Sequence, residues 1–171
     1  IEVKGREVIE VGSQDVNGTP RSVILPLGPS RYVGVDSGHG PGVDVVAKAE
    51  DLVTVFGAGS FDVVISTEVL EHLEDWRAVV LQMKKVLRLN GILIVTTRSP
   101  GFPYHPFPID MWRFTIEDMQ SIFIDLDILE LKSDPGMAGV FLKARKPLGF
   151  READLFSIEV AKAPPPEGSH A

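Results

Sequence analysis

The chain has 171 residues, of which 44% are hydrophobic, and a formal net charge of −7. Such a length suits one domain with a sizeable core, and the acidic balance argues against a nucleic-acid partner, because phosphate binding needs clustered Lys and Arg. The absence of cysteine excludes disulfides and thiolate metal sites. The apolar runs are too short for a membrane span, and the N-terminus does not resemble a signal peptide. We therefore expect a cytoplasmic protein without a membrane partner.

The first half of the chain alternates short apolar runs with turns. These runs predict strands at residues 7–11, 31–36, 43–49 and 61–66, the last typical of a buried parallel strand. Thr19 and Pro20 indicate the start of a short helix, which Pro26 and Pro29 stop. The segment 37–42, SGHGPG, is too rich in glycine to form a helix.

The second half contains the clearest helix, at residues 74–90. Its apolar residues recur on one helical face, acids stand at its start and bases near its end, and Asn90-Gly91 supplies a stop signal. Thr115 and Asp118 form a capping-box pattern that predicts a second helix at 115–123. The remaining apolar runs predict strands at 92–97 and, approximately, at 126–132, 139–145 and 155–162.

Strands that alternate with helical or loop crossovers predict an α/β fold. We expect a Rossmann-like open, mostly parallel sheet with helices on both faces and an antiparallel C-terminal edge strand. Residues 1–163 would form one domain, and the Pro-rich tail 164–171 would be disordered. Ligands of such sheets bind at the carboxyl ends of the strands, which directs attention to the residues that follow each strand.

The stretch VIEVGSQDVNG, residues 8–18, is a strand that runs into a glycine turn. Only Gly12 fits the phosphate-binding G-x-G-x-x-G pattern, and Glu10 and Asp15 would repel a pyrophosphate. A ligand with a ribose and cationic groups but no phosphate resolves both objections. S-adenosylmethionine has these properties, because its sulfonium and ammonium groups favour nearby carboxylates.

With VIEVGSQDVNG, YVGVDSGHGPGVDVV, AKAEDL, FDVVISTEVLEHLEDW and LRLNGILIVTTRSPG in order, the chain resembles a class I S-adenosylmethionine-dependent methyltransferase of the small type called methyltransferase domain 11. The resemblance covers roughly residues 7–101 and implies S-adenosylmethionine as cofactor. It implies cofactor contacts from Glu10, Gly12 and Ser13 at the turn, Asp36 and Ser37 at the ribose, Ala49 and Glu50 at the adenine, and Ser66, Thr67 and Glu68 at the methionine end.

Gln14 and Val16 stand where the family usually has glycines, and Lys48 replaces a common acid before the adenine loop. These departures keep a second hypothesis open, a catalytically degenerate binding module with the same fold. A third hypothesis is a nicotinamide-dependent oxidoreductase, against which the acidic turn and the absent G-x-G-x-x-G count.

Methyl transfer needs a positioned acceptor, and a general base is optional. Candidate bases are His72, in TEVLEH, and His105, in the loop 99–114 after the strand 92–97. Prolines and aromatic residues make this loop a stiff apolar wall that suits an acceptor pocket, or else ordinary core packing, and Asp110 and Arg113 are expected to pair. We expect methylation of O or N in a small-molecule or sugar-like acceptor.

A sharper alternative comes from Glu68, Glu71 and His72, which form E-x-x-E-H, with His105 on the next loop. This stretch is similar to the metal-binding constellation of RNA 3′-terminal 2′-O-methyltransferases of small-RNA pathways, and such ligands suit Mg²⁺ or Mn²⁺. Because E-H after this strand is also common in metal-free relatives, and because the acidic chain lacks an RNA-binding surface, the prediction is no metal and no nucleic acid. The sequence leaves a homodimer open.

Overall fold

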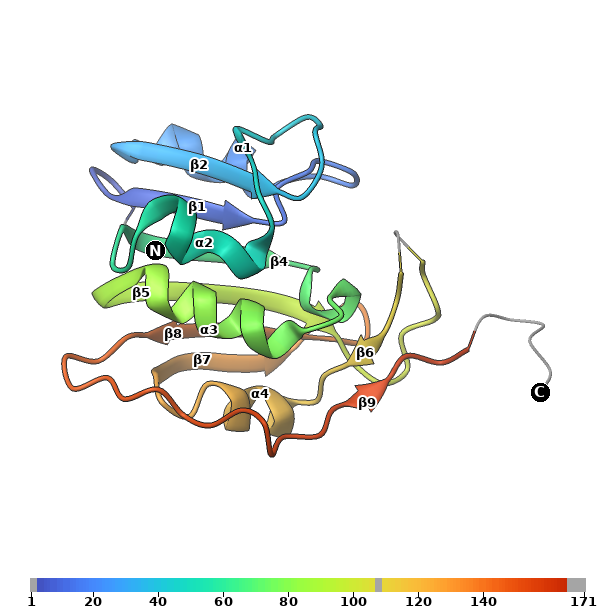
Figure 1. The fold of residues 1–171 in the computed structure, drawn as a ribbon. Helices are drawn as coiled ribbons and strands as arrows, with labels where there is room; N and C mark the ends of the chain where they lie inside the picture. Colours follow the sequence, from blue (N-terminus) through green and yellow to red (C-terminus); the bar gives the residue numbers. More distant parts are fainter. Residues whose placement is uncertain (1–2, 107–108, 166–171) are drawn as a thin grey trace.

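The computed structural model describes residues 3–106 and 109–165. Its main sheet has seven strands in the order β3-β2-β1-β4-β5-β8-β7 (Figure 1). Their bounds are β1 Glu7–Val11, β2 Arg31–Asp36, β3 Val45–Val46, β4 Phe61–Thr67, β5 Leu87–Arg98, β7 Asp127–Ser133 and β8 Gly139–Arg145. Strands β1 to β5 pair in parallel, whereas β8 is antiparallel to both β5 and β7. The predicted Rossmann-like, mostly parallel sheet with antiparallel pairing at its C-terminal edge is confirmed.

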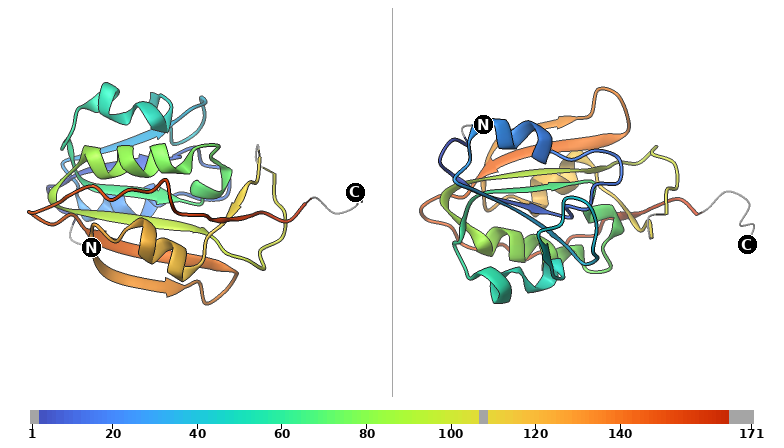
Figure 2. Two further views of the ribbon diagram at one scale, coloured as in Figure 1. Left: turned by 60° about the horizontal axis from the view of Figure 1, so that its bottom comes forward. Right: turned by 90° about the horizontal axis from the view of Figure 1, so that it is seen from above.

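Helices cover the two faces of this sheet unequally, as Figure 2 shows. The α-helices are α1 Arg21–Ile24, α2 Leu52–Phe56, α3 Trp76–Val86 and α4 Ile116–Ile122, and the 3-10 turns are η1 Leu25–Leu27, η2 Ala49–Asp51 and η3 Leu70–His72. The larger core lies on the face of α2, α3 and α4, and the smaller one lies on the face of α1. Successive side chains of β1 point to opposite faces of the sheet, so that Ile9 packs into the larger core and Val8 into the smaller one.

Helix α3 begins as its sequence predicts but ends earlier. The Asp75 side chain accepts a hydrogen bond from the Ala78 N–H and caps the first turn. The predicted end at residue 90 is wrong, because Leu87 is already extended and begins β5. Asn90, at φ 63°, turns the backbone inside that strand. A side chain at Gly91 would come within 2.9 Å of a β4 carbonyl oxygen, so the expected stop signal serves the strand instead.

Two predicted strands are shorter than expected. The strand predicted at 43–49 is confined to Val45–Val46, and residues 49–56 form η2 and α2, a helix that the sequence analysis missed. The strand predicted at 155–162 reduces to β9, Ala161–Lys162, which pairs with β6, Trp112–Arg113, in a separate sheet. Before β9 the chain crosses α3, where Arg77 donates to the Leu155 carbonyl at 3.0 Å and also to Ile158. These bonds satisfy carbonyls that a neighbouring strand would otherwise bind.

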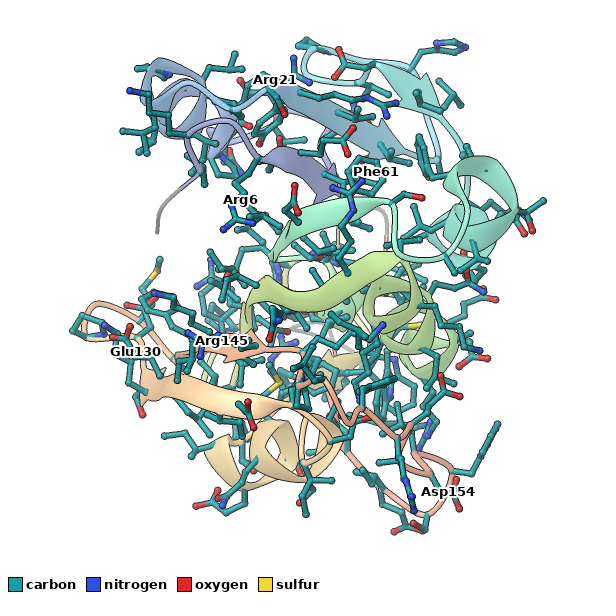
Figure 3. The ribbon with its side chains drawn as sticks, turned by 90° about the vertical axis from the view of Figure 1, so that its left-hand side faces the viewer. Arg6, Arg21, Phe61, Glu130, Arg145 and Asp154 are labelled. Carbon is teal, nitrogen blue, oxygen red and sulfur yellow. The ribbon has the colours of Figure 1, made fainter. Side chains whose placement is uncertain are left out.

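The described residues contain no helix that is long and apolar enough to cross a membrane. Of the predicted disordered tail, residues 166–171 lie outside the described residues, whereas Pro164 and Pro165 are described and exposed. Figure 3 shows the end of the sheet where β4 begins at Phe61 and the antiparallel β8 ends at Arg145. The candidate site lies at the opposite end.

Candidate functional site

The carboxyl ends of β1, β2, β4 and β5 meet on the right-hand side of Figure 1, beside η3 and β6. The glycine turn after β1, the loop 37–42 after β2 and the η3 turn after β4 come together at this edge. The Asp15 N–H donates to the Pro41 carbonyl at 2.8 Å, which fixes the loop after β2 against the glycine turn. Ligands of open α/β sheets bind in this position.

Gly12 has a structural role within the chain itself. Its φ of 77° lies in the left-handed region, where a side chain is disfavoured. A Cβ there would also overlap the Cγ2 methyl of Val69, in the segment after β4. The turn is therefore packed directly against the loop that follows β4.

The Glu10 carboxylate, on the α1 face of β1, is only 2% exposed. Thr19 Oγ1 donates to it at 2.9 Å and the Tyr32 hydroxyl at 2.7 Å. Burial raises the pKa of Glu10, although these hydrogen bonds and Arg21 oppose the rise. Most of the hydrogen-bonding capacity of Glu10 is thus already used by the protein.

Asp36 ends β2 with its carboxylate directed at the glycine turn. Its two oxygens accept hydrogen bonds from the N–H groups of Gln14 and Gly38, each at 3.2 Å. The Ser37 hydroxyl lies 3.5 Å from the same carboxylate. Next along this edge come Ala49 and Glu50, which open η2.

Buried polar groups lie in the turn after β1 and near the end of β4, and a strained residue follows β4. The hydroxyls of Ser13 and Ser66 are buried and have no hydrogen-bond partner among the described residues. Thr67 is half-buried and begins the exit from the strand. Glu68 has a φ of 57°, a conformation that costs a non-glycine residue about 1–2 kcal/mol. Its carboxylate accepts from Thr96 Oγ1 at 2.6 Å and forms an ion pair with Arg98.

The two candidate bases lie together. The rings of His72 and His105 are edge to face with centroids 4.9 Å apart. His72 Nδ1 bonds to the Ile109 carbonyl oxygen, and His105 Nδ1 lies 3.0 Å from Asp110 Oδ2. Burial lowers the pKa of His72, which favours the neutral ring at physiological pH. Beside them Glu71 is fully buried, and burial raises its pKa to about 8.

Comparisons with known proteins agree with this geometry. Residues 22–95 match the family model described as a methyltransferase domain, and this segment runs from α1 through the site to β5. This match, over less than half of the chain, supports a class I S-adenosylmethionine-dependent methyltransferase. The resemblance found in the sequence is confirmed, with S-adenosylmethionine as the cofactor of this class. A search of curated protein sequences found no significant match.

Many solved structures share this fold. The Burkholderia thailandensis 1,6-didemethyltoxoflavin-N1-methyltransferase, solved with 1,6-didemethyltoxoflavin and S-adenosylhomocysteine bound, has a TM-score of 0.67 at 16% identity, covering 84% of this chain and 72% of that one. A Mesorhizobium loti S-adenosylmethionine-dependent methyltransferase has a TM-score of 0.66 at 16% identity, covering 85% and 93%. The cyclase SpnF reaches 0.67 at 16% identity, covering 85% and 77%, so the fold alone does not define the reaction.

A buried ion pair holds the loop after β5 together internally. Arg113 donates to both Asp110 oxygens, at 2.6 and 2.7 Å, as the sequence analysis expected. The same guanidinium bonds to the carbonyls of Phe102 and Pro103. A cavity of about 680 Å³ opens beside this loop, lined by prolines, by the side chains of Phe102, Tyr104 and Arg113, and by β9.

Sequence reasoning missed some groups of the site. Thr96 and Arg98, which hold Glu68, were not singled out, although VTTR at the end of an apolar run was a usable signal. Val69, which packs on Gly12, was not singled out and offered no signal.

Proposed function

We propose that this domain binds S-adenosylmethionine at the carboxyl ends of β1 and β2 and transfers its methyl group to O or N of a small-molecule or sugar-like acceptor. Asp36 is the observation that carries the proposal. Its Oδ2 holds only the backbone N–H of Gln14, whereas Oδ1 holds that of Gly38 and, at 3.5 Å, the Ser37 hydroxyl. An ionised carboxylate oxygen can accept about two hydrogen bonds. Oδ2 can therefore accept from one ribose hydroxyl, and Oδ1 can accept from the other once the Ser37 hydroxyl rotates away.

The rest of the cofactor follows from this anchor. Ala49 and Glu50, beyond β3, frame the adenine. Ser13 and Ser66 have buried hydroxyls without partners among the described residues, and buried polar groups normally find one. We assign these hydroxyls to the methionine end, together with Gly12. The remaining predicted contacts are Ser37 at the ribose, Glu10 at the glycine turn, and Thr67 and Glu68 at the methionine end.

In the reaction the acceptor atom forms a bond to the methyl carbon as the carbon–sulfur bond breaks. The bond electrons go to sulfur, which becomes the thioether of S-adenosylhomocysteine, and the acceptor loses its proton. His72 and His105 are the groups proposed to receive this proton. The lowered pKa of His72 keeps the ring neutral and able to accept it.

Thermal unfolding tests the cofactor. Saturating S-adenosylhomocysteine or S-adenosylmethionine should raise the melting temperature, because a ligand at a hundred times its dissociation constant stabilises the native state by about 2.7 kcal/mol. NAD should not. The variant Asp36→Ala should lose the shift, whereas the control Asp127→Ala, at the exposed start of β7, should keep it. A shift with NAD alone would contradict the proposal and favour the oxidoreductase.

The second candidate is a degenerate binding module, favoured by Gln14 and Val16 in the glycine turn and by the cyclase that shares the fold. It predicts cofactor binding without methyl transfer to any acceptor offered. A radiolabelled methyl group from S-adenosylmethionine, offered with panels of hydroxyl and amine acceptors, separates the two functions. Transfer to any acceptor would exclude the degenerate module.

The setting of the domain also belongs to the proposal. We propose a cytoplasmic protein that uses a small molecule and no nucleic acid, since the chain is acidic with a net charge of −7. A homodimer is compatible with this account. Sedimentation of the purified protein measures the oligomeric state directly.

A further inference from the structure

We propose that the cavity of about 680 Å³ beside the loop after β5 binds an aromatic acceptor that carries a carboxylate, and that Lys162 recognises this carboxylate. Residues 100–104 and Arg113 form one wall of the cavity, and Ala161, Lys162, Pro164 and Pro165 form the other. The volume lies within the range of about 300–1,000 Å³ that small-molecule sites occupy. That the ligand is the methyl acceptor rests on the proposed function, whereas the binding of an aryl carboxylate does not.

Hydrogen bonds within the chain hold both walls in place. The Arg113 guanidinium donates to the carbonyl oxygens of Phe102 at 3.3 Å and Pro103 at 3.0 Å, which shapes the wall after β5. On the other side β9 pairs with β6 (Figure 1), and the Ala163 N–H donates to the Met111 carbonyl at 2.8 Å. The cavity is therefore formed before a ligand enters, as small-molecule sites usually are.

Phe102 connects the cavity to the proposed site of methyl transfer. This residue lines the cavity, and its ring meets the ring of His105 edge to face with centroids 4.8 Å apart. The Arg98 guanidinium lies 4.1 Å from the centroid of the same ring and is paired with Glu68, at the proposed methionine end of the cofactor. One side chain therefore separates a ligand that contacts Phe102 from the proposed proton acceptor His105.

The lining favours an aromatic body over a sugar, which narrows the proposed acceptor. Four prolines and two aromatic residues surround the space: Pro100, Pro103, Pro164, Pro165, Phe102 and Tyr104. Such residues offer flat apolar surface and few hydrogen-bonding groups. Arg113 adds none, because its five N–H donors are already bound to a carboxylate and to backbone carbonyls. Several hydroxyls of a sugar would stay unpaired here, which costs free energy, whereas an aromatic ring needs no such partners.

Lys162 supplies the charge that a carboxylate requires. The Asp110 carboxylate neutralises Arg113, so Lys162 is the cation of the lining that is left for a ligand. Its side chain is exposed. The ion pairs that lysines form among the described residues do not include Lys162. One ammonium group balances the charge of one carboxylate and has three N–H donors to offer it.

The test is calorimetric titration of the whole chain, with and without saturating S-adenosylhomocysteine. The probes are para-hydroxybenzoate, para-aminobenzoate and caffeate, each compared with its neutral methyl ester, and glucose. We expect at least one acid to bind, and to bind more tightly than its ester by about two- to fivefold, the range of an exposed ion pair. Glucose should bind more weakly than this acid.

Matched variants assign the preference to one side chain. Lys162→Met should bind acid and ester equally, whereas Lys162→Arg should still prefer the acid. Lys4→Met, in the exposed turn before β1, removes a lysine at another place and should bind as the wild type does. Tyr104→Ala should weaken the binding of acid and ester alike, because the aromatic wall serves both.

Unaltered circular dichroism of the variants shows that they fold. Equal affinity of acid and ester for the wild type, an unchanged preference in Lys162→Met, tighter binding of glucose, or no binding of any acid would each overturn the proposed ligand. Binding of an acid without a response to S-adenosylhomocysteine would overturn the proposed function and leave the ligand of the cavity standing. A response to S-adenosylhomocysteine without binding of any acid would do the reverse.

Discussion

Gly12→Ala should destabilise the protein more than any backbone effect alone explains. At φ 77°, an L-residue costs about 1–2 kcal/mol. The new Cβ also overlaps Val69 Cγ2 and lies 3.3 Å from Val69 Cβ. Overpacking of this kind costs about 1–3 kcal/mol, so the free energy of unfolding should fall by about 2–5 kcal/mol in total.

A matched control isolates the steric part. Gly5 has a φ of 69°, and nothing lies within 4 Å of the position of its Cβ. Gly5→Ala should therefore lose only about 1–2 kcal/mol. In a Val69→Ala background the overlapping methyl is absent, and Gly12→Ala should then cost no more than Gly5→Ala.

Urea unfolding of the single and double variants at one temperature gives these free energies by linear extrapolation. If Gly12→Ala lowers the free energy of unfolding no more than Gly5→Ala does, the glycine turn does not pack against the segment after β4 as described. If the Val69→Ala background fails to relieve the cost, the steric reasoning is refuted even where the total agrees.

Three further predictions concern stability. Thr115→Ala removes the capping box of α4 and should cost about 1 kcal/mol in urea unfolding, while Ser121→Ala in the same helix should change little. Lys84→Met leaves Asp125 buried without its ion pair and should cost about 3–5 kcal/mol; adding Asp125→Asn should recover part of this, and no recovery would argue against the pair. Burial raises the pKa of Glu10. The contribution of its protonated form to the free energy of unfolding is therefore complete below the unfolded pKa near 4.5 and is lost as pH rises through the folded pKa. Glu10→Gln should flatten this pH dependence in a series of unfolding curves.

Much of the fold could be predicted because its central strands are short apolar runs between clear turns. The end of α3 could not be, because Leu87 continues the apolar spacing of the helix while its backbone already pairs with β4. Helix α2 was missed because LVTVF is rich in residues that favour strands. Tertiary contacts decide its state, since Leu52 is buried and Gln82 of α3 accepts a hydrogen bond from the Val53 N–H.

Part of the candidate site could be predicted because its residues lie at or just after the carboxyl ends of the predicted strands. Asp36 and Gly12 were singled out because they follow strands, and the structure brings the segments that bear them together. The proximity of His72 and His105 depends on how the loop after β5 folds back onto η3, where the Met111 N–H donates to the Glu71 carbonyl at 2.8 Å, a long-range contact that local sequence does not encode. The packing of Val69 on Gly12 is likewise a long-range contact that no spacing indicates.

Calorimetric titration with S-adenosylhomocysteine, on the wild type and on Asp36→Ala side by side, tests the central claim most directly. The account predicts a single site on the wild type and loss of measurable binding in a folded Asp36→Ala protein. Equal affinity of the two proteins would contradict the placement of the ribose at Asp36. Absence of binding to the folded wild type would contradict the cofactor itself.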